Sequence, residues 1–385
     1  MAISREPIRI LHIVGRMDRG GIETMLMNIY RKIDRNQVQF DFLAHYGKEA
    51  AYNEEIRAMG GRIYEMPALK DENHVYYWRL FSYIRALDRF FREHREYKVI
   101  HGHMTNTASI YMPIARKYGV KCTIAHSHST KGKAGLLGIA TDFLQKPIHR
   151  CATDWFACSQ AAAGWFYPRE AVQQGKVTLI PNAIDAQKFR YRPEVRDRVR
   201  RELGVENRTV IGCVGRFRPE KNQKFLLPVL RCLQEKDPGA MLMFVGDGPC
   251  EADVKEQCRN LGLSESVLFL GQRNDVDQLM QAMDVFVLPS FWEGLPLVGV
   301  EAQSAGLPCV VSGGVTEELD ITGNMLRVAL DDGPGAWAAA LEQATAMERR
   351  DTCDTIRRAG YDLDTTVPWL QDFYLRKADV HEQQD

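Results

Sequence analysis

The chain has 385 residues, of which 45% are hydrophobic and 26% charged, and its formal net charge at pH 7 is zero. This length predicts two domains, and the composition excludes a disordered or fibrous chain. Residues 1–185 hold 26 Lys and Arg against 18 Asp and Glu, and residues 186–385 hold 24 against 32, which indicates either an anionic partner for the first half or a chance division between domains.

The N-terminus and the cysteines indicate a cytoplasmic protein without disulfides. Residues 1–9 lack the apolar core and cleavage site of a signal peptide, and no apolar run approaches the roughly 20 residues that span a bilayer. Nine cysteines occur without a C-x-x-C pair, and Cys213 and Cys309 lie inside apolar runs, where buried free thiols are ordinary. We therefore expect neither a disulfide framework nor a cysteine zinc site.

Strand-length apolar runs alternate with helix-length segments, such as 23–33 and 223–236, which predicts parallel sheets with crossover helices. The series of strands restarts once. The first series is 8–14, 40–44, 99–102, 121–125, 153–158 and 177–181, and the second is 209–214, 241–245, 267–270, 284–288 and 309–312. We interpret the charge-dense stretch 185–207 as the linker and expect domains of residues 1–185 and 186–364, followed by a last helix from Thr365.

The first strand is followed by the sequence GRMDRGGIETML at residues 15–26. Gly20 and Gly21 permit a close approach of the backbone to a ligand, and Glu23 opens the next helix. The dinucleotide fingerprint G-x-G-x-x-G is absent. A glycine pair alone is most often a tight turn, so both interpretations stay open.

Residues 78–95 predict an amphipathic helix. Its apolar face holds four residues at helical spacing, Leu80, Ile84, Leu87 and Phe91. A basic stripe beside that face holds Arg85, Arg89 and Arg92. Either the helix packs by its apolar face with a solvated basic stripe, or the arginines and Trp78 rest on an anionic membrane surface and bring the protein to a lipid-linked acceptor.

Two H-x-H pairs follow strand-like runs, His101 with His103 and His126 with His128. Alternation along a strand puts both members of a pair on one face, so a metal site has to be weighed. Zinc requires a third or fourth ligand, which the spacing does not supply. We therefore expect no metal, and we interpret one histidine as a contact to the reacting substrate.

The stretch IGCVGRFRPEKN at 211–222 ends a strand at Gly215 and delivers Arg216 and Lys221 into the following loop. The carboxyl ends of parallel strands line the ligand crevice of an open sheet, where two cations could hold a diphosphate. A solvated Arg and Lys is the alternative. Only their combination with a nearby helix N-terminus favours a binding site.

The triplet D-x-D occurs twice, at residues 275–277 and 362–364. Such a pair of carboxylates can hold a divalent ion on a diphosphate, but the pattern is common by chance. Asp275 is better explained as the N-cap of a helix over 276–283, because Asp is a preferred capping residue.

The most informative stretch is PSFWEGLPLVGVEAQSAGLPCVVS at 289–312. An apolar strand ends just before it, and Pro296 stands at the first position of a helix, where its missing N–H costs nothing. The first free N–H groups of this helix make a natural phosphate site. They belong to Leu297, Val298 and Gly299.

Two glutamates flank that helix start. Glu293 lies in the loop beside Gly294, and Glu301 lies eight residues later on the second turn, so both can face one ligand and accept hydrogen bonds from a diol. A lone acid in the first turns would only complement the helix dipole. Two acids around the Gly-Leu-Pro elbow favour a binding site.

Eight motifs in this order resemble the retaining, GT-B-fold glycosyltransferases of the fourth sequence family, especially the bacterial branch that builds capsules and exopolysaccharides. The motifs are GGIE at 20–23, AHSHS at 125–129, ACSQAAAGWF at 157–166, LIPNAID at 179–185, VGRFRPEKN at 214–222, VGDGP at 245–249, FLGQRNDV at 269–276 and PSFWEGLPLVGVEAQSAGLP at 289–308. They span nearly the whole chain, and the E-x7-E pattern is fairly specific. The sequence departs from the family at Ala183, where many members have Gly, which affects only local backbone geometry.

The resemblance implies an α/β protein with two Rossmann-like domains facing a central cleft. The N-terminal domain, residues 1–185, would bind the acceptor, and the C-terminal domain, residues 186–364, the nucleotide-sugar donor. The C-terminal helix, 365–385, would cross back to the N-terminal domain.

The resemblance also implies a role for each matching residue. Arg216 and Lys221 would bind the donor diphosphate, Glu301 the ribose hydroxyls, and Glu293 the hydroxyls of the donor sugar. The remaining donor positions would act through main-chain groups. Those near Arg273 and Asn274 would contact the base, and those around Leu297 and Val298, after Gly294, would contact the distal phosphate. Gly21, next to Gly20, would approach the phosphates from the other domain. The sugar-contacting histidine matches His126 or His128. We favour His126, the first residue past the strand, and assign His128 and Asn106 to the acceptor side.

The implied reaction is the transfer of a hexose from a nucleotide sugar, most readily a UDP-sugar, to a saccharide or lipid-linked acceptor in the synthesis of surface polysaccharide or glycoconjugates. No carboxylate has the setting of a covalent nucleophile, so front-face substitution is implied, with no metal and no cofactor. We expect a cytoplasmic protein that is peripheral at the inner face of the membrane and has no nucleic-acid partner.

Three alternatives remain. One is a catalytically inactive sugar-nucleotide-binding protein, which would have to keep both glutamates and the cation pair without use. Another is a nucleotide-sugar epimerase, which lacks this order of motifs. An NAD-dependent oxidoreductase is disfavoured because the Gly-rich fingerprint and its acid about 20 residues later are missing.

Overall fold

A computed structural model describes residues 6–45, 49–67, 79–128 and 148–379 of the chain. The chain forms two compact units. Unit 1 comprises residues 1–183 and 363–385, and unit 2 comprises residues 184–362. The boundaries expected from the sequence were 185/186 and 364/365.

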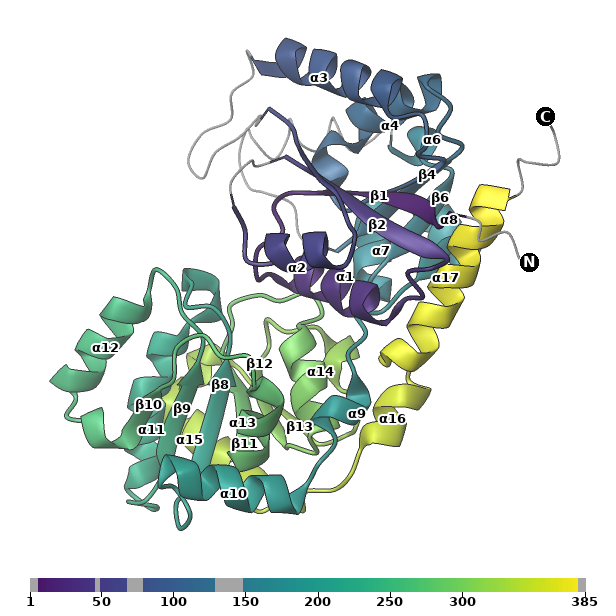
Figure 1. Cartoon of the computed structure of the whole chain (residues 1–385). Helices are drawn as coiled ribbons and strands as arrows, with labels where there is room; N and C mark the ends of the chain where they lie inside the picture. The colour runs from purple at the N-terminus through teal and green to yellow at the C-terminus, as the bar shows by residue number, and fades with distance from the viewer. Residues whose placement is uncertain (1–5, 46–48, 68–78, 129–147, 380–385) are drawn as a thin grey trace. The chain divides into compact units, whose positions relative to one another are not determined.

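Unit 1 is built on a seven-stranded parallel sheet in the order β3-β2-β1-β4-β5-β6-β7 (Figure 1). Six of its strands match the expected runs within two residues, and β3 was missed because two half-buried residues and one exposed residue make no periodic pattern. The strands are β1 Ile8–Val14, β2 Val38–Ala44, β3 Ile63–Glu65, β4 Val99–Gly102, β5 Cys122–Ser127, β6 Asp154–Ala157 and β7 Val177–Leu179.

Alternation along these strands gives the sheet two different faces. On one face, Leu11 and Ile100 pack in an apolar core with the helices α3 and α4. The other face carries His12 and His101, against which Tyr374 of the helix α17 packs. The helical elements of unit 1 are α1 Gly21–Lys32, α2 Asn53–Ala58, α3 Leu80–Glu93, η2 Thr105–Thr107, α4 Ala108–Lys117, α6 Ile148–Cys151, α7 Gln160–Phe166, α8 Arg169–Gln173 and α17 Leu363–Asp379.

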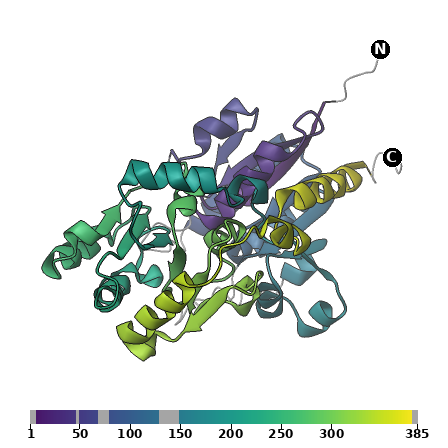
Figure 2. The ribbon, with the colours of Figure 1, turned by 90° about the horizontal axis from the view of Figure 1, so that it is seen from below.

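The last helix, α17, belongs to unit 1 although all of unit 2 precedes it in the chain. It packs beside α1 and against β1, β2 and β4, and both ribbon views show the yellow helix beside the purple and blue elements of unit 1 (Figures 1 and 2). Gln371 accepts a hydrogen bond from the backbone N–H of Asp34 at 2.9 Å, and Lys377 pairs with Asp154 at 2.7 Å. The expected return of the C-terminal helix to the N-terminal domain is thus confirmed, and residues 380–385 of that expectation lie outside the described residues.

Unit 2 is built on a six-stranded parallel sheet in the order β10-β9-β8-β11-β12-β13. Five strands match the expected runs, whereas β13 at the sheet edge was missed because its residues are half-exposed or exposed. The strands are β8 Val210–Val214, β9 Met241–Val245, β10 Val267–Phe269, β11 Val285–Leu288, β12 Cys309–Ser312 and β13 Met325–Val328. Two parallel, Rossmann-like sheets confirm the predicted α/β fold class.

The core of unit 2 gathers the buried side chains of β8, β9 and β11 beneath α11, α12 and α15, with Trp337 fully buried. The helical elements are α9 Ala186–Phe189, α10 Pro193–Leu203, η3 Pro219–Lys221, η4 Gln223–Phe225, α11 Leu226–Gln234, α12 Glu251–Asn260, η5 Ser264–Ser266, α13 Val276–Ala282, α14 Leu297–Ser304, η6 Glu317–Leu319, η7 Leu330–Asp332, α15 Gly333–Thr345 and α16 Cys353–Arg358.

The stretch expected to be a linker, 185–207, is instead a folded part of unit 2. It forms α9 and α10, and α10 packs against α13. Two of its arginines are bonded inside the unit: buried Arg200 donates to the carbonyl of Ala282 at 2.7 Å and to Asp284 at 3.1 Å, and Arg196 donates to Asp284 at 2.5 Å. Charge density suggested a solvated linker because these partners lie about eighty residues further along the chain.

The packed face of α3 is only partly the one predicted, because Leu87 and Phe91 are buried as expected whereas Leu80 and Ile84 are not. Its buried residues are Tyr83, Leu87, Phe90 and Phe91. Leu80 and Ile84, expected on the packed face, are 37% and 36% exposed, and Phe81 beside them is 80% exposed. The arginines of the basic stripe are exposed, and Trp78 lies outside the described residues.

All nine cysteines are free thiols, as the sequence predicted. Among the described residues, no helix combines the length and the apolar character needed to cross a bilayer.

Candidate active site

The strand order of unit 2 reverses at β8, which has β9 on one side and β11 on the other. Ligands of open α/β sheets bind outside the carboxyl ends of the strands at such a point. The loops that leave β8 and β11 meet there: the N–H of Phe291 donates to the carbonyl of Glu220 at 2.8 Å, and Asn222 donates to the carbonyl of Pro289 at 3.2 Å. The fold therefore brings together the two stretches that the sequence singled out.

Lys221 and Glu293 form an ion pair at this junction. Ser290 donates to the same carboxylate oxygen at 2.8 Å, and the N–H of Glu293 donates to the carbonyl of Gly314 at 2.9 Å. A side chain on Gly314 would meet the carbonyl oxygen of Phe291 at 2.1 Å, so this close approach requires glycine. Ser290 was missed by sequence reasoning, because nothing in the local pattern separates it from an ordinary loop serine.

Arg216 follows β8 and is exposed. Its carbonyl accepts a hydrogen bond from Gln223 at 3.0 Å, which holds the loop. Within the described ranges its guanidinium has no hydrogen bond or ion pair, so the cation is available to an anionic ligand.

The helix α14 begins at Leu297, with Pro296 as its N-cap rather than its first residue. The N–H of Gly299 turns back to the carbonyl of Pro296 at 3.0 Å. Helix geometry leaves the N–H groups of Leu297 and Val298 without intrahelical partners, so two of the three expected donors are available to an anion. Gly294 is half-buried in the turn that precedes the helix.

Glu301 lies on the second turn of α14 and is half-buried. Burial raises its pKa to about 7, nearby Asp277 adds to the rise, and Lys188 partly offsets it. The carboxylate is therefore close to half ionised at neutral pH, and a small change of surroundings or pH decides its charge.

The two carboxylates of the D-x-D triplet at 275–277 have different partners and do not face a common point. Arg273 donates to both carboxylate oxygens of Asp275, at 2.8 and 2.6 Å. Asp275 stands at the N-cap of α13, but its side chain caps nothing, because the arginine engages it. Asp277 faces Lys188 at 3.5 Å instead. Arg273 and the exposed Asn274 lie after β10, two strands away from β8.

The strand order of unit 1 reverses between β1 and β4. Gly20 and Gly21 start α1 in the loop after β1, and no atom lies within 4 Å of where a Cβ on exposed Gly21 would stand. Asn106 is half-buried in the turn η2 after β4. These three candidates thus lie beyond the carboxyl ends of β1 and β4 in unit 1, as Arg216, Lys221 and Glu293 lie beyond those of β8 and β11 in unit 2.

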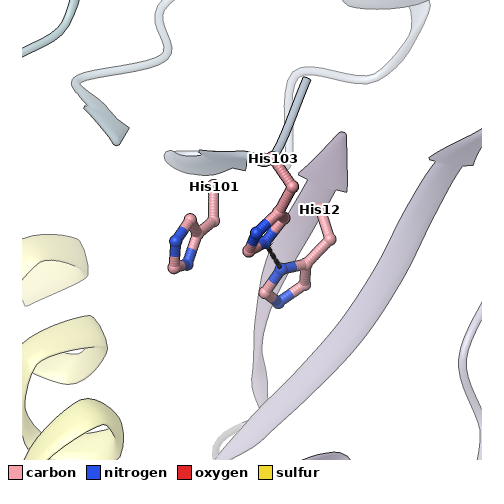
Figure 3. Close-up of side chains that lie close together, drawn as sticks. All are labelled: His12, His101 and His103. Carbon is pink, nitrogen blue, oxygen red and sulfur yellow. Dashed lines mark hydrogen bonds between the residues drawn. The ribbon is translucent and has the colours of Figure 1, made fainter. Parts of the chain in front are cut away.

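Five histidines of unit 1 gather on one face of its sheet. His12 on β1 stands opposite His101 on β4, and Figure 3 shows their rings together with that of His103. Four of the rings are buried and that of His128 is half-buried. The members are His12, His101, His103, His126 and His128. His12 was missed because strand pairing, which the sequence does not display, brings it to the others.

Hydrogen bonds join these rings into two chains. In the first, the Tyr374 hydroxyl lies 2.6 Å from Nδ1 of His101, whose Nε2 lies 3.0 Å from Nδ1 of His126. In the second, Nδ1 of His12 lies 3.1 Å from Nε2 of His103. Nδ1 of His103 in turn lies 2.9 Å from Nε2 of His128.

Burial lowers the pKa of every ring in these chains. The pKa of His12 and that of His128 fall to about 3, and the pKa values of the other three fall well below the ordinary value. The rings are neutral at physiological pH, so each has one N–H donor and one acceptor nitrogen.

The same rings define where a metal ion would fit. Two groups offer three ring nitrogens within 4.8 Å of one another. They are His12 with His101 and His103, and His103 with His126 and His128. His12 supplies the third ligand that the sequence spacing lacked, although an ion there would replace the hydrogen bonds between rings.

Comparison with known proteins matches both halves of the chain to family models. Residues 19–188 match "Glycosyltransferase Family 4", and residues 195–362 match "Glycosyl transferases group 1". The chain is 35% identical over 376 residues to the putative glycosyltransferase EpsF of Bacillus subtilis, covering 95% of this chain and 96% of that protein.

A second relative is an Escherichia coli enzyme named UDP-Gal:alpha-D-GlcNAc-diphosphoundecaprenol alpha-1,3-galactosyltransferase. It is 33% identical over 226 residues, which cover 56% of this chain and 58% of that protein. Among solved structures, Anabaena HepE in complex with UDP-glucose superposes with a TM-score of 0.74 at 19% identity, covering 95% of this chain and 99% of HepE. The likeness to HepE supports the fold.

Proposed function

The chain belongs to the GT-B-fold glycosyltransferases of family 4, and we propose that it moves a hexose from a UDP-sugar, with retention, to a saccharide or lipid-linked acceptor in surface polysaccharide or glycoconjugate synthesis. The main support for a donor-binding site in unit 2 is the ion pair between Lys221 and Glu293, where the loops after β8 and β11 meet. A cation, an acceptor of hydroxyl protons and a helix N-terminus stand there together in one unit. UDP is favoured because the Escherichia coli relative is named for UDP-Gal and HepE was solved with UDP-glucose.

In the proposed reaction the bond from the anomeric carbon to the diphosphate breaks as the acceptor oxygen bonds to the same face of that carbon. The acceptor proton passes to an oxygen of the departing diphosphate. Arg216, Lys221 and the N–H groups of Leu297 and Val298 stabilise the negative charge that grows on the leaving group. Glu293, oriented by Ser290, holds hydroxyls of the donor sugar, and Glu301 holds those of the ribose.

The test is to incubate the purified protein with UDP-, GDP- and ADP-sugars, with and without excess EDTA, and to measure the nucleoside diphosphate released. We expect release of UDP that EDTA does not reduce, because protein cations and N–H groups take the place of a metal. Release of GDP or ADP alone would overturn the donor assignment. Activity lost in EDTA and restored by Mg²⁺ or Mn²⁺ would overturn metal independence.

Glu301 should make donor binding depend on pH. With a pKa of about 7, the carboxylate that accepts both ribose hydroxyls disappears as the pH falls. Between pH 8 and 6 the ionised fraction falls about tenfold, and UDP affinity should fall by up to about the same factor. Glu301→Gln should bind UDP roughly ten- to a hundredfold more weakly at pH 8, the cost of a lost charged hydrogen bond.

Calorimetric titration with UDP measures both effects. Because the terminal phosphate of UDP also titrates, the informative quantity is the difference in pH dependence between the wild type and Glu301→Gln. Glu265→Gln, an exposed acid on η5, is the matched control and should behave as wild type. A pH dependence that persists unchanged in Glu301→Gln would rule out the ribose contact.

We propose that unit 1 approaches its acceptor at an anionic membrane through the α3 surface. This surface consists of the exposed apolar residues Leu80, Phe81 and Ile84 and the exposed arginines Arg85, Arg89 and Arg92. The apolar residues can enter the headgroup layer while the arginines contact anionic lipids. The observed packing of α3 supports this proposal, because it leaves Leu80, Phe81 and Ile84 at the surface beside the basic stripe.

Co-sedimentation with vesicles that contain anionic lipid tests this surface. Each arginine near the membrane contributes about 1 kcal/mol, so Arg85→Gln/Arg89→Gln/Arg92→Gln should bind roughly a hundredfold more weakly at low salt. The control is a triple Gln variant at three exposed cations of unit 2, Arg201, Lys224 and Arg231. Equal binding of the two triple variants would contradict the assignment of the α3 surface.

A further inference from the structure

The first histidine chain runs from the C-terminal helix to the candidate sugar contact. Tyr374, His101 and His126 are 0%, 2% and 1% exposed, so all three side chains are shielded from bulk water. The chain ends at Nε2 of His126, a buried nitrogen without a hydrogen-bond partner among the described residues. An unpaired buried group of this kind is costly unless a ligand supplies its partner.

The hydroxyl of Tyr374 gives this chain a direction. Burial raises the pKa of Tyr374 well above its ordinary value, so the hydroxyl keeps its proton. Across the described residues, Nδ1 of His101 is the one partner of that hydroxyl. If the hydroxyl accepted instead, its proton would be buried without an acceptor, which costs about 1 to 3 kcal/mol. Tyr374 therefore donates to Nδ1 of His101.

The direction then passes from ring to ring. A neutral imidazole that accepts at Nδ1 carries its proton on Nε2. His101 therefore donates from Nε2 to Nδ1 of His126, and His126 in turn carries its proton on Nε2. The unpaired nitrogen at the end of the chain is a donor.

The second chain shows what happens without such a hydroxyl. His12, His103 and His128 are linked in the same way, but both end nitrogens, Nε2 of His12 and Nδ1 of His128, lack partners among the described residues. Either direction satisfies the same two hydrogen bonds. Only the hydrogen-bond chain that begins at Tyr374 of α17 has a fixed donor-to-acceptor direction.

We propose that Tyr374 and His101 are positioning residues, which hold His126 as its Nε2–H tautomer so that it donates a hydrogen bond to a hydroxyl of the donor sugar. The sugar contact of His126 belongs to the proposed function, and this inference rests on it. A neutral ring that carries its proton on Nε2 can only donate from that nitrogen, and a sugar hydroxyl oxygen can accept it. Helix α17 thereby acquires a role in the reaction in addition to packing.

The experiment reads the tautomer directly in the full-length protein. Two-bond ¹H–¹⁵N correlation spectra of protein labelled with ¹⁵N-histidine distinguish Nδ1–H, Nε2–H and metal-bound rings, and His126→Asn identifies the His126 signals. We expect His126 as the Nε2–H tautomer in the wild type and a substantial Nδ1–H population in Tyr374→Phe. Tyr111→Phe is the matched control, because it removes a buried hydroxyl from the opposite face of the same sheet and should leave the tautomer unchanged.

Kinetics adds a second measurement. Tyr374→Phe should lower kcat for transfer by about three- to tenfold, the factor that corresponds to one neutral hydrogen bond, with little change in UDP affinity. An Nδ1–H tautomer in the wild type, an unchanged tautomer in folded Tyr374→Phe, or metal-bound ring nitrogens together with stoichiometric metal would each overturn the proposal. If the tautomer shifts but neither Tyr374→Phe nor His126→Ala alters transfer, the sugar contact in the proposed function is wrong, and the link from Tyr374 to His126 stands.

Discussion

Lowering the pH from about 7.5 to about 5.5 should unfold unit 1 while unit 2 keeps its structure. Six histidines of unit 1, five of them buried and His128 half-buried, have lowered pKa values, those of His12 and His128 falling to about 3 and that of His45 to about 4. The remaining members are His101, His103 and His126. Residues 184–362 contain no histidine.

Unit 1 loses stability as the pH falls because the unfolded state binds more protons than the folded state. In the unfolded chain these histidines titrate near the ordinary value of about 6.5, so below that pH the unfolded state takes up protons that the folded state refuses. The stabilisation is fully present above pH 6.5 and is lost as the pH falls toward the folded-state pKa values. At pH 5.5 each histidine costs about 1 kcal/mol, and six together cost on the order of 5 kcal/mol or more, which is comparable with the whole stability of a domain.

Hydrogen exchange followed by mass spectrometry distinguishes the two units at each pH. His12→Phe keeps an aromatic ring between Phe40 and Phe42 and should reduce the pH slope of unit 1 stability by about one proton. His94→Gln, a partly exposed position, is the control and should leave the slope as in the wild type. Loss of protection in both units at the same pH would contradict the prediction.

Replacing Lys221 or Arg216 by Ala should lower kcat for transfer by roughly a hundred- to a thousandfold, the cost of removing one preorganised group that stabilises a developing negative charge. Affinity for UDP should fall much less, because the charge on the leaving group grows in the transition state. The double variant should lose less than the product of the two single losses, since both cations act on one diphosphate. Rate assays and calorimetry with UDP measure the two quantities.

Two further variants make this result specific. Lys221→Ala also deprives Glu293 of its cation, so Lys221→Arg, which keeps the charge, should recover part of the rate. Lys224→Ala removes an exposed lysine three residues away and should leave the rate unchanged. Equal losses of rate and UDP affinity in both single variants would mean that the two cations only anchor the nucleotide.

Local pattern was sufficient to predict the buried strands and the loops that follow them, because parallel strands are apolar throughout and helices have a distinct period. Half-exposed edge strands such as β3 and β13 carry no such signal. The same limit explains the error at 185–207, where Arg200 is charged and nevertheless buried by partners distant in sequence. It also explains α3, where aromatic residues determine the packed face.

The candidate site likewise has residues that the sequence could identify and contacts between residues that it could not. Arg216, Glu293 and Glu301 stand in stretches whose spacing is visible in the sequence. The pairing of Lys221 with Glu293 spans 72 residues, and that of His101 with Tyr374 spans 273, so neither follows from spacing. Sequence reasoning identified the chemical groups, and the fold determined which groups touch.

The return of α17 to unit 1 has a consequence for how the protein is made. A ribosome completes residues 184–362 before it synthesises α17, so unit 2 has its whole sequence while unit 1 still lacks the helix that carries Tyr374. Domains usually complete their folding in order from the N-terminus during synthesis, at about 5 to 20 residues per second. In this chain the order is reversed: the first domain to emerge is the last to be finished, and until then the histidine face of its sheet has no cover from α17.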